Sequence, residues 1–143
     1  MPTRTTKTAA GGTSIEVESG NVETRFSPQF DVSTAADFTT VWDTNIGDFS
    51  EGTVSLSAQV RANTGAEWSA IEARAVGYIG STPSILGIWM LGGVKNTASF
   101  PIGEGKKFDR LAIEARIVVD GSPGPGSLTP LEARLSASAK LWG

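Results

Sequence analysis

The chain has 143 residues, of which 39% are apolar, and a formal net charge of −3 from 12 basic and 15 acidic side chains. It contains neither cysteine nor histidine, which excludes disulfides, thiolate chemistry, imidazole metal ligands and histidine-dependent catalytic triads. Seventeen glycines and seven prolines favour a turn-rich β domain over a helical bundle, and the small negative charge argues against nucleic acid as a partner.

The sequence has no segment suited to a membrane or to export. The N-terminus lacks the apolar core of a signal peptide, and the longest apolar run, 85–91, has seven residues, too few to span a bilayer. We therefore expect one soluble all-β domain without cofactor, metal or membrane partner, made in a host cytoplasm. Its length is sufficient to bury roughly 70% of the surface that the unfolded chain exposes.

Residues 1–13 form a threonine-rich segment that contains Arg4 and Lys7 and no acid. The segment has too little apolar surface to become ordered alone, and fully extended it reaches about 40 Å. We predict an extended N-terminal arm at 1–13, followed by a β-sandwich domain at 14–143, with a long edge strand as the alternative for the arm. Arg4 and Lys7 are candidate partner-binding residues.

Beyond the arm, apolar and polar residues alternate with period two, which is typical of half-buried strands. Val54, Leu56 and Ala58 give the clearest example. The sequence therefore predicts an antiparallel β-sandwich of eight or nine strands, with a jelly-roll arrangement as one option. Strands are expected near 14–19, 22–27, 53–62, 69–79, 85–91, 94–100, 109–119 and 131–141.

Two shorter segments carry local signals. Thr34 to Asp37 resembles a helix capping box, so 34–42 is either a short helix or a strand or loop. Leu91-Gly92-Gly93-Val94 predicts a tight hairpin, because two glycines readily adopt the positive φ angles of a type I′ turn.

A short internal repeat predicts how strands pair. Ala-Ile-Glu-Ala-Arg occurs at 70–74 and again at 112–116, and its centre recurs at 132–134. In antiparallel pairing each Glu lies opposite an Arg, which places Glu72 against Arg116 and Arg74 against Glu114. The same rule predicts a second pairing of 112–116 with 132–134, and so a three-stranded block with 109–119 in the middle.

The two faces of these strands have different expected roles. The Glu–Arg ladder is interpreted as a solvated face, with a subunit interface as the alternative. The opposite face should pack against the second sheet, and it consists of Ile71, Ala73, Ala75, Ile113, Ala115, Ile117, Leu131, Ala133, Leu135, Ala137 and Ala139.

Strand 85–91 is apolar on both faces, so we expect it to be central or covered by another subunit. Ile88, Trp89 and Leu91 are therefore candidate partner-binding residues, although Trp89 also looks like a core residue. Trp142 is a further candidate partner-binding residue. An alternative use of the aromatic residues is sugar stacking, because flat rings on a β-sandwich suit sugar rings. The candidate stacking residues are Trp68 and Tyr78, with Trp142 expected on the same side.

Two further chemistries are weaker. Asp43, Asn45, Asp48 and Glu51 gather oxygen ligands in one loop, but their order departs from that of an EF-hand, and a turn stabilised by its own side chains is the simpler interpretation. Carboxylate pairs can hydrolyse glycosides without histidine, yet the acids here lie in turns or opposite arginines. We expect a non-enzymatic protein.

Several features resemble small β-sandwich virion proteins of tailed bacteriophages, of the head decoration or cement type. These features are the arm MPTRTTKTAAGGT, the absence of cysteine and histidine, the glycine- and alanine-rich strands, and the ending on Leu141-Trp142-Gly143. The resemblance implies a non-catalytic virion protein that bridges capsid subunits, as a homo-oligomer bound to other virion proteins on a capsid or tail surface. A carbohydrate-binding module is the alternative.

Overall fold

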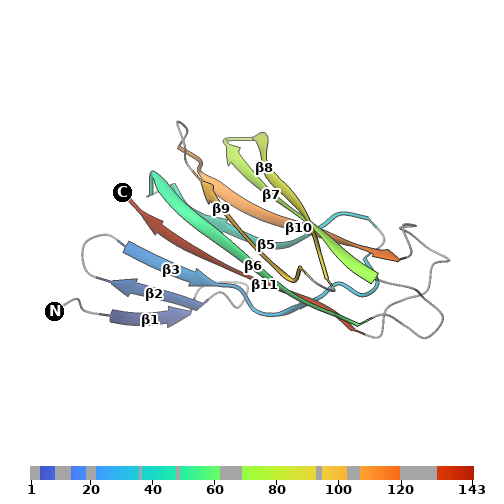
Figure 1. The fold of residues 1–143 in the computed structure, drawn as a ribbon. Helices are drawn as coiled ribbons and strands as arrows, with labels where there is room; N and C mark the ends of the chain where they lie inside the picture. The colour runs from blue at the N-terminus through green and yellow to red at the C-terminus, as the bar shows by residue number, and fades with distance from the viewer. Residues whose placement is uncertain are drawn as a thin grey trace.

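The computed structural model describes residues 4–8, 14–18, 22–35, 37–47, 49–61, 69–92, 95–102, 107–119 and 132–143. These residues form eleven strands in two antiparallel sheets that pack face to face (Figure 1). The predicted antiparallel β-sandwich is therefore confirmed, but the described residues form eleven strands where eight or nine were predicted. None of the described residues is helical. The described part of the segment near 34–42 is turn or loop up to Phe38 and then enters strand β5 (Thr39–Asn45), which agrees with the strand-or-loop alternative.

The larger sheet has seven strands in the order β1-β2-β3-β11-β6-β9, with β4 also paired to β11. The β1–β2 hairpin lies at one end of this sheet (Figure 1). Its strands are β1 (Arg4–Thr8), β2 (Ser14–Glu18), β3 (Val22–Phe26), β4 (Phe30–Asp31), β6 (Glu51–Arg61), β9 (Thr97–Ile102) and β11 (Glu132–Trp142).

The smaller sheet has four strands in the order β5-β10-β7-β8. These are β5 (Thr39–Asn45), β7 (Ser69–Ile79), β8 (Thr82–Leu91) and β10 (Arg110–Val119). Strand β8 therefore forms one edge of this sheet, and β5 forms the other.

The core lies between the sheets and follows the period-two pattern of the sequence. In β6 and β11, alternate residues such as Leu56, Leu135 and Leu141 are buried, while their neighbours are more exposed. The described members of the predicted inward face are all buried, and Leu131 lies outside the described residues. Small alanines on the facing strands allow the two sheets to approach closely.

The predicted pairing of β7 with β10 is confirmed, since Glu114 lies opposite Arg74 and Arg116 opposite Glu72. The predicted pairing of 109–119 with 131–141 is wrong. Strand β5 occupies the second side of β10, where Asp43 pairs with Arg110, and β11 joins the other sheet.

The repeat gave a wrong prediction because its charges are compatible with more than one neighbouring strand, whereas its apolar residues determine the sheet to which each strand belongs. Strands β10 and β11 both have inward alanines and large aliphatic residues, so they contribute to opposite walls of one core. Glu132 of β11 lies opposite Arg61 of β6. Arg61 therefore provides the opposite charge that the prediction had assigned to Arg116. Complementary charges therefore fix a register only after the neighbouring strand is known.

The segment after Leu91 also differs from its prediction. Gly92 and Lys95 form an isolated antiparallel bridge, with Gly92 N–H donating to the Lys95 carbonyl at 2.7 Å. The chain reverses as expected, but β8 and β9 then join different sheets. They do not form a hairpin, because each pairs with another strand.

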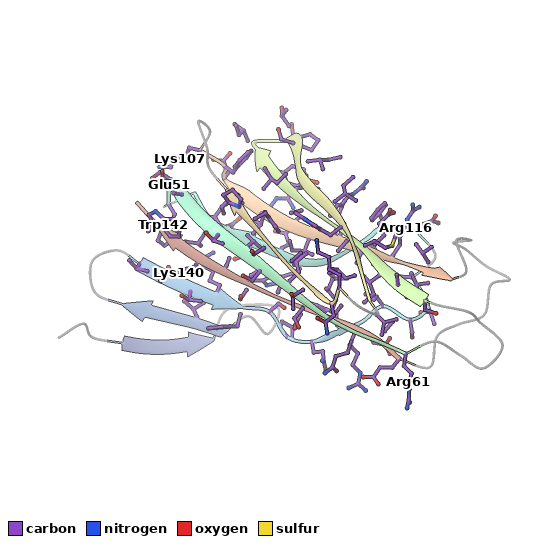
Figure 2. All side chains as sticks on the ribbon, viewed as in Figure 1. Glu51, Arg61, Lys107, Arg116, Lys140 and Trp142 are labelled. Atoms are coloured by element: carbon purple, nitrogen blue, oxygen red, sulfur yellow. The ribbon has the colours of Figure 1, made fainter. Side chains whose placement is uncertain are left out.

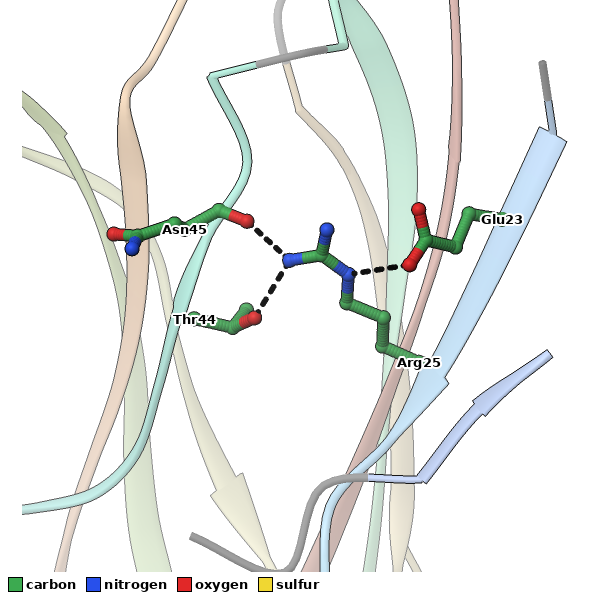
Figure 3. Close-up of polar contacts among 4 residues, drawn as sticks. All are labelled: Glu23, Arg25, Thr44 and Asn45. Atoms are coloured by element: carbon green, nitrogen blue, oxygen red, sulfur yellow. Dashed lines mark hydrogen bonds and ion pairs between the residues drawn. The ribbon is translucent and has the colours of Figure 1, made fainter. Parts of the chain in front are cut away.

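One arginine joins the two sheets at the β3–β5 side of the sandwich (Figure 3). The Arg25 side chain, on β3, donates to Thr44 Oγ1 at 2.7 Å and to the Asn45 carbonyl, both on β5. Its Nε lies 3.3 Å from Glu23 Oε1, and the two charged side chains are only 12% and 13% exposed. Its guanidinium carbon lies 5.7 Å from the centre of the Phe49 ring.

Asp31 is the last residue of the short strand β4, and its Oδ1 accepts the Ser33 amide at 2.9 Å. The hydrogen bonds from the Ser33 amide and hydroxyl hold the pKa of Asp31 below its usual value, and the charge of Arg134 acts in the same direction. Because the folded pKa is the lower one, the ionised Asp31 stabilises the fold above its unfolded pKa of about 3.9. This contribution is lost as the pH falls through the folded pKa.

We expect Asp31→Asn to flatten the decline in melting temperature below about pH 4. The change should be small because Asp31 is exposed, and Ser33→Ala should give an intermediate profile by removing one of the two donors. Thermal melts between neutral and strongly acidic pH measure this. An acid limb of unchanged slope in Asp31→Asn would contradict the assignment.

Candidate functional site

The most unusual surface of the described chain is a row of exposed apolar side chains along β8. Ile85, Ile88 and Met90 are 58%, 53% and 46% exposed, and Ile79, at the end of β7, is 46% exposed. Strand β8 has no charged residue in its sequence TPSILGIWML. Edge strands of natural proteins usually carry charges that prevent pairing with other chains, so this edge is suited to contact with a partner.

The local structure of β8 explains which side chains face outward. The register with β7 shifts between Ala75 and Val76, so that Ile85 lies opposite Val76 and Gly87 opposite Ala75. Leu86 is the extra residue of this bulge and packs against the core. After the bulge the pairing is regular from Gly87 to Leu91, with Ile88 and Met90 on the outer face.

Of the predicted partner-binding residues on β8, Ile88 is the one with a largely exposed side chain. Leu91 is completely buried, so it belongs to the core of this chain and not to a contact surface. Trp89 points inward and stacks on Phe100, with ring centroids 4.5 Å apart and an interplanar angle of 20°. It is half-buried and closes the core between the edge strands β8 and β9.

Gly87 is required by this arrangement. A Cβ atom on Gly87 would lie 2.2 Å from the Trp89 ring, so any side chain there would displace the indole. The prediction that strand 85–91 is central in its sheet is wrong, because among the described strands β8 pairs only with β7 and therefore lies at the edge of the sheet. The alternative, a cover provided by another subunit, remains a prediction.

The Glu–Arg ladder lies next to this row on the outer face of the smaller sheet. Arg74 Nε donates to Glu114 Oε1 at 2.5 Å, and Arg116 Nε donates to Glu72 Oε1 at 2.7 Å. The ring of Phe38 lies 4.0 Å from the guanidinium carbon of Arg74 and 4.6 Å from that of Arg116. The four charged side chains are 16–29% exposed, so they form a partly buried layer.

We expect Arg116→Glu to lower the free energy of unfolding by about 1–2 kcal/mol, because it sets two carboxylates face to face and removes a cation from the Phe38 ring. The charge swap Glu72→Arg with Arg116→Glu should recover most of this loss, because the pair is restored in reverse. Urea denaturation midpoints measure both. A double variant no more stable than Arg116→Glu alone would contradict the pairing.

Of the aromatic residues predicted to form a sugar platform, the two that the structure describes, Tyr78 and Trp142, lie on different sheets. Tyr78 is on the smaller sheet, where the Arg110 guanidinium covers its ring at 3.9 Å. Trp142 is at the end of β11 in the larger sheet, so the prediction that it shares a side with Tyr78 is wrong. Trp68 lies outside the described residues.

The outer face of the larger sheet contains a feature that the sequence reasoning missed. An open groove of about 760 Å³ is lined by hydroxyl side chains of β6, β9 and β11, with Phe26 and Lys95 beside them. A second hollow of about 550 Å³ contains Trp142, Lys140 and Thr24. The alternating Ser and Thr residues in 53–57 and 136–138 could have indicated this groove. They form one surface, however, only because β6 and β11 are neighbouring strands.

Trp142 is held at one end of this face. Its indole N–H donates to Glu51 Oε2 at 2.8 Å, and Figure 2 shows both residues and Lys140 at one end of the sandwich, with Arg116 near the other. The Glu51 carboxylate is therefore engaged by Trp142 and not by the predicted cation loop. Asp43 pairs with Arg110, and Asp48 lies outside the described residues. In the described ranges, no three acidic side chains converge on a common point suited to a metal.

The arm residues Arg4 and Lys7 lie on β1, an edge of the larger sheet, with their backbones opposite Glu18 and Ile15. Their side chains lie outside what the structure describes. The division into an arm at 1–13 and a domain at 14–143 stays a prediction. The described part of the chain has no helix long and apolar enough to cross a membrane.

No family model matches the chain, and no curated protein matches it. A solved structure of Bacillus endospore appendages, a family of disulfide-linked pili, is similar at a TM-score of 0.47 and 14% identity, covering 95% of this chain and 96% of that one. A chain of infectious bursal disease virus, Gx strain, is similar at a TM-score of 0.40 and 15% identity, covering 99% of this chain and 32% of that one. This chain therefore spans about a third of the viral one.

Proposed function

We propose that this protein is a non-catalytic structural subunit that binds other protein subunits in a larger assembly. The assembly that we propose is the virion of a tailed bacteriophage, in which the chain decorates the shell and bridges neighbouring capsid subunits. The observation that carries this proposal is the uncharged edge strand β8 with its exposed Ile85, Ile88 and Met90.

The ionisable groups support a structural role. Several of the acids whose side chains the structure describes are engaged by other side chains or by the backbone. Glu72 and Glu114 pair with arginines, Glu51 accepts the Trp142 indole N–H, and Asp109 accepts the Gly80 amide at 2.6 Å. A general acid or base must be within reach of a substrate proton, whereas these contacts hold the carboxylates against groups of the protein itself.

The size of the apolar row indicates what kind of binding to expect. Fully burying an Ile or Met side chain is worth about 1.5–3 kcal/mol, so four half-exposed ones contribute about 4 kcal/mol on one side of an interface. Association costs at least about 4 kcal/mol in lost freedom. The row alone therefore gives weak binding, and many copies on a regular shell supply the avidity that makes such contacts stable.

The arm adds a second contact in this proposal. Strand β1 forms an edge of the larger sheet, and the 1–13 segment contains two basic residues and no acid. Arg4 and Lys7 would then bind an acidic surface of a neighbouring subunit, at the opposite sheet from β8.

The particle itself provides the test. Virions purified on a density gradient from the cells that make this chain should contain it at a fixed ratio to the main shell subunit, as measured by quantitative mass spectrometry. Its absence from these particles would overturn the virion assignment, and catalytic turnover by the purified chain would overturn the non-catalytic one.

The second candidate function is carbohydrate binding, which the hollow around Trp142 favours. Thr24, Thr53, Ser138 and Lys140 line the same hollow as Trp142, and sugars bind by stacking on such a ring with hydrogen bonds at its rim. Tryptophan fluorescence during titration with oligosaccharides tests this. A spectral change that persists in Trp142→Ala would place the sugar elsewhere, whereas Tyr78→Phe serves as the control on the opposite sheet.

A further inference from the structure

We propose that two copies of this chain pair through their β8 edges in an antiparallel, two-fold arrangement. Trp89 then lies opposite the second copy's Trp89, and Ile88 opposite the second copy's Met90. The inference rests on the proposed function, since it names the occupant of the same edge.

The chemistry of the edges selects a second copy as this occupant. A strand that pairs with β8 needs free backbone groups and apolar side chains on its outer face. Among the described edge strands, β5 exposes Thr40 and Asp43, β9 exposes Thr97 and Ser99, and β1 has the sequence RTTKT. Only β8 itself presents large apolar side chains there, so like pairs with like, as a two-fold interface requires.

The bulge in β8 sets the register. Pairing with β7 is regular from Gly87 to Leu91 and shifts before Gly87. A two-fold pairing confined to these regular residues is centred on Trp89. A centre at Ile88 would instead oppose Met90 to Leu86, inside the bulge, where an extra residue disrupts the ladder.

Charges on the neighbouring strand agree with this register. Arg74 lies beside Ile88, and Glu72 beside Met90, so each row across the pair begins at Arg74 and ends at the second copy's Glu72. The effect is weak, because the two β7 strands would be three strand spacings, about 14 Å, apart, which exceeds the Debye length at physiological ionic strength. Packing of the apolar row therefore dominates.

The absence of cysteine makes a direct test available. We would mix Ile88→Cys and Met90→Cys chains, one of them with a size tag, under mild oxidation. Directly opposed residues have Cα atoms about 4.5–5.5 Å apart, which suits a disulfide. Identical positions would be diagonal, at about 7–8 Å, and should not link. We expect the mixed disulfide, with little homodimer from either variant alone.

Solution mass provides the second measurement. Light scattering on the full chain should give twice the monomer mass of 14.9 kDa at high concentration, and Met90→Lys should return it to the monomer. Thr97→Lys, on the exposed β9 edge, should leave the dimer intact.

The outcomes separate this inference from the proposed function. A monomer at every concentration without the mixed disulfide would overturn the β8 pair, and so would a disulfide between identical positions. Recovery of such a monomer in purified virions at a fixed ratio would still support the proposed function. A dimer with the mixed disulfide that is missing from virions would support the pair alone.

Discussion

Arg25→Ala is expected to lower the free energy of unfolding by about 3 kcal/mol, because it leaves a buried partner charge without its counterion. Glu23 is 13% exposed and pairs with Arg25 at 3.3 Å, and the Asn45 carbonyl and Thr44 hydroxyl lose a donor at the same time. For a chain of this length the melting temperature should fall by about 10 °C. Calorimetry at neutral pH measures it.

Two variants separate the charge from the packing. Glu23→Gln combined with Arg25→Met removes both charges and keeps most of the volume, so it should be more stable than Arg25→Ala alone. Arg61→Ala removes an exposed arginine from β6 and should change stability by no more than about 0.5 kcal/mol. If Arg25→Ala costs no more than Arg61→Ala, the two sheets do not depend on this link.

Gly52→Ala is expected to lower the free energy of unfolding by about 2–3 kcal/mol through overpacking. Gly52 is buried in β6 between Leu141 and Ile102 on the flanking strands. A Cβ atom there would lie 2.8 Å from the Lys140 carbonyl oxygen and 2.8 Å from Leu141 Cδ2. The backbone oxygen is unable to move away without disturbing the β6–β11 pairing.

Gly47→Ala is the matched control, because its Cβ would come no closer than 3.8 Å to Asp109. A glycine replaced where the space is free gains about 0.4–1 kcal/mol from the reduced entropy of the unfolded chain. Chemical denaturation of both variants should therefore give shifts of opposite sign. Equal shifts would mean that β6 and β11 relax around Gly52.

The β8 edge matters for the folding of the free chain as well as for the proposed assembly. The same absence of charge that suits this strand to a partner also makes it prone to non-specific aggregation while it is free. A bulge near Leu86 and Pro83 at its start shorten the regular part of the edge. A chain with such a strand gains from having its partner present in high concentration, as in an assembling particle.

Much of the local structure was readable from the residue order. Alternation in 53–62, 69–79, 109–119 and 131–141 correctly placed the inward residues that the structure describes, because a strand exposes opposite faces at successive positions. The Glu–Arg repeat also predicted the β7–β10 register. Segment 34–42 was ambiguous, because a capping signal at Thr34 competed with β-branched residues that tertiary pairing favoured.

Sequence by itself determined the fold class, the inward faces and the excluded chemistries, because these depend on residue type and period. Tertiary structure decided which strands are neighbours. It moved β11 away from β10, set β8 at an edge and separated Trp142 from Tyr78. Each strand presents the same backbone groups to any partner. The choice between neighbouring strands therefore depends on how all the inward side chains together fill one core, which is determined only in the folded chain.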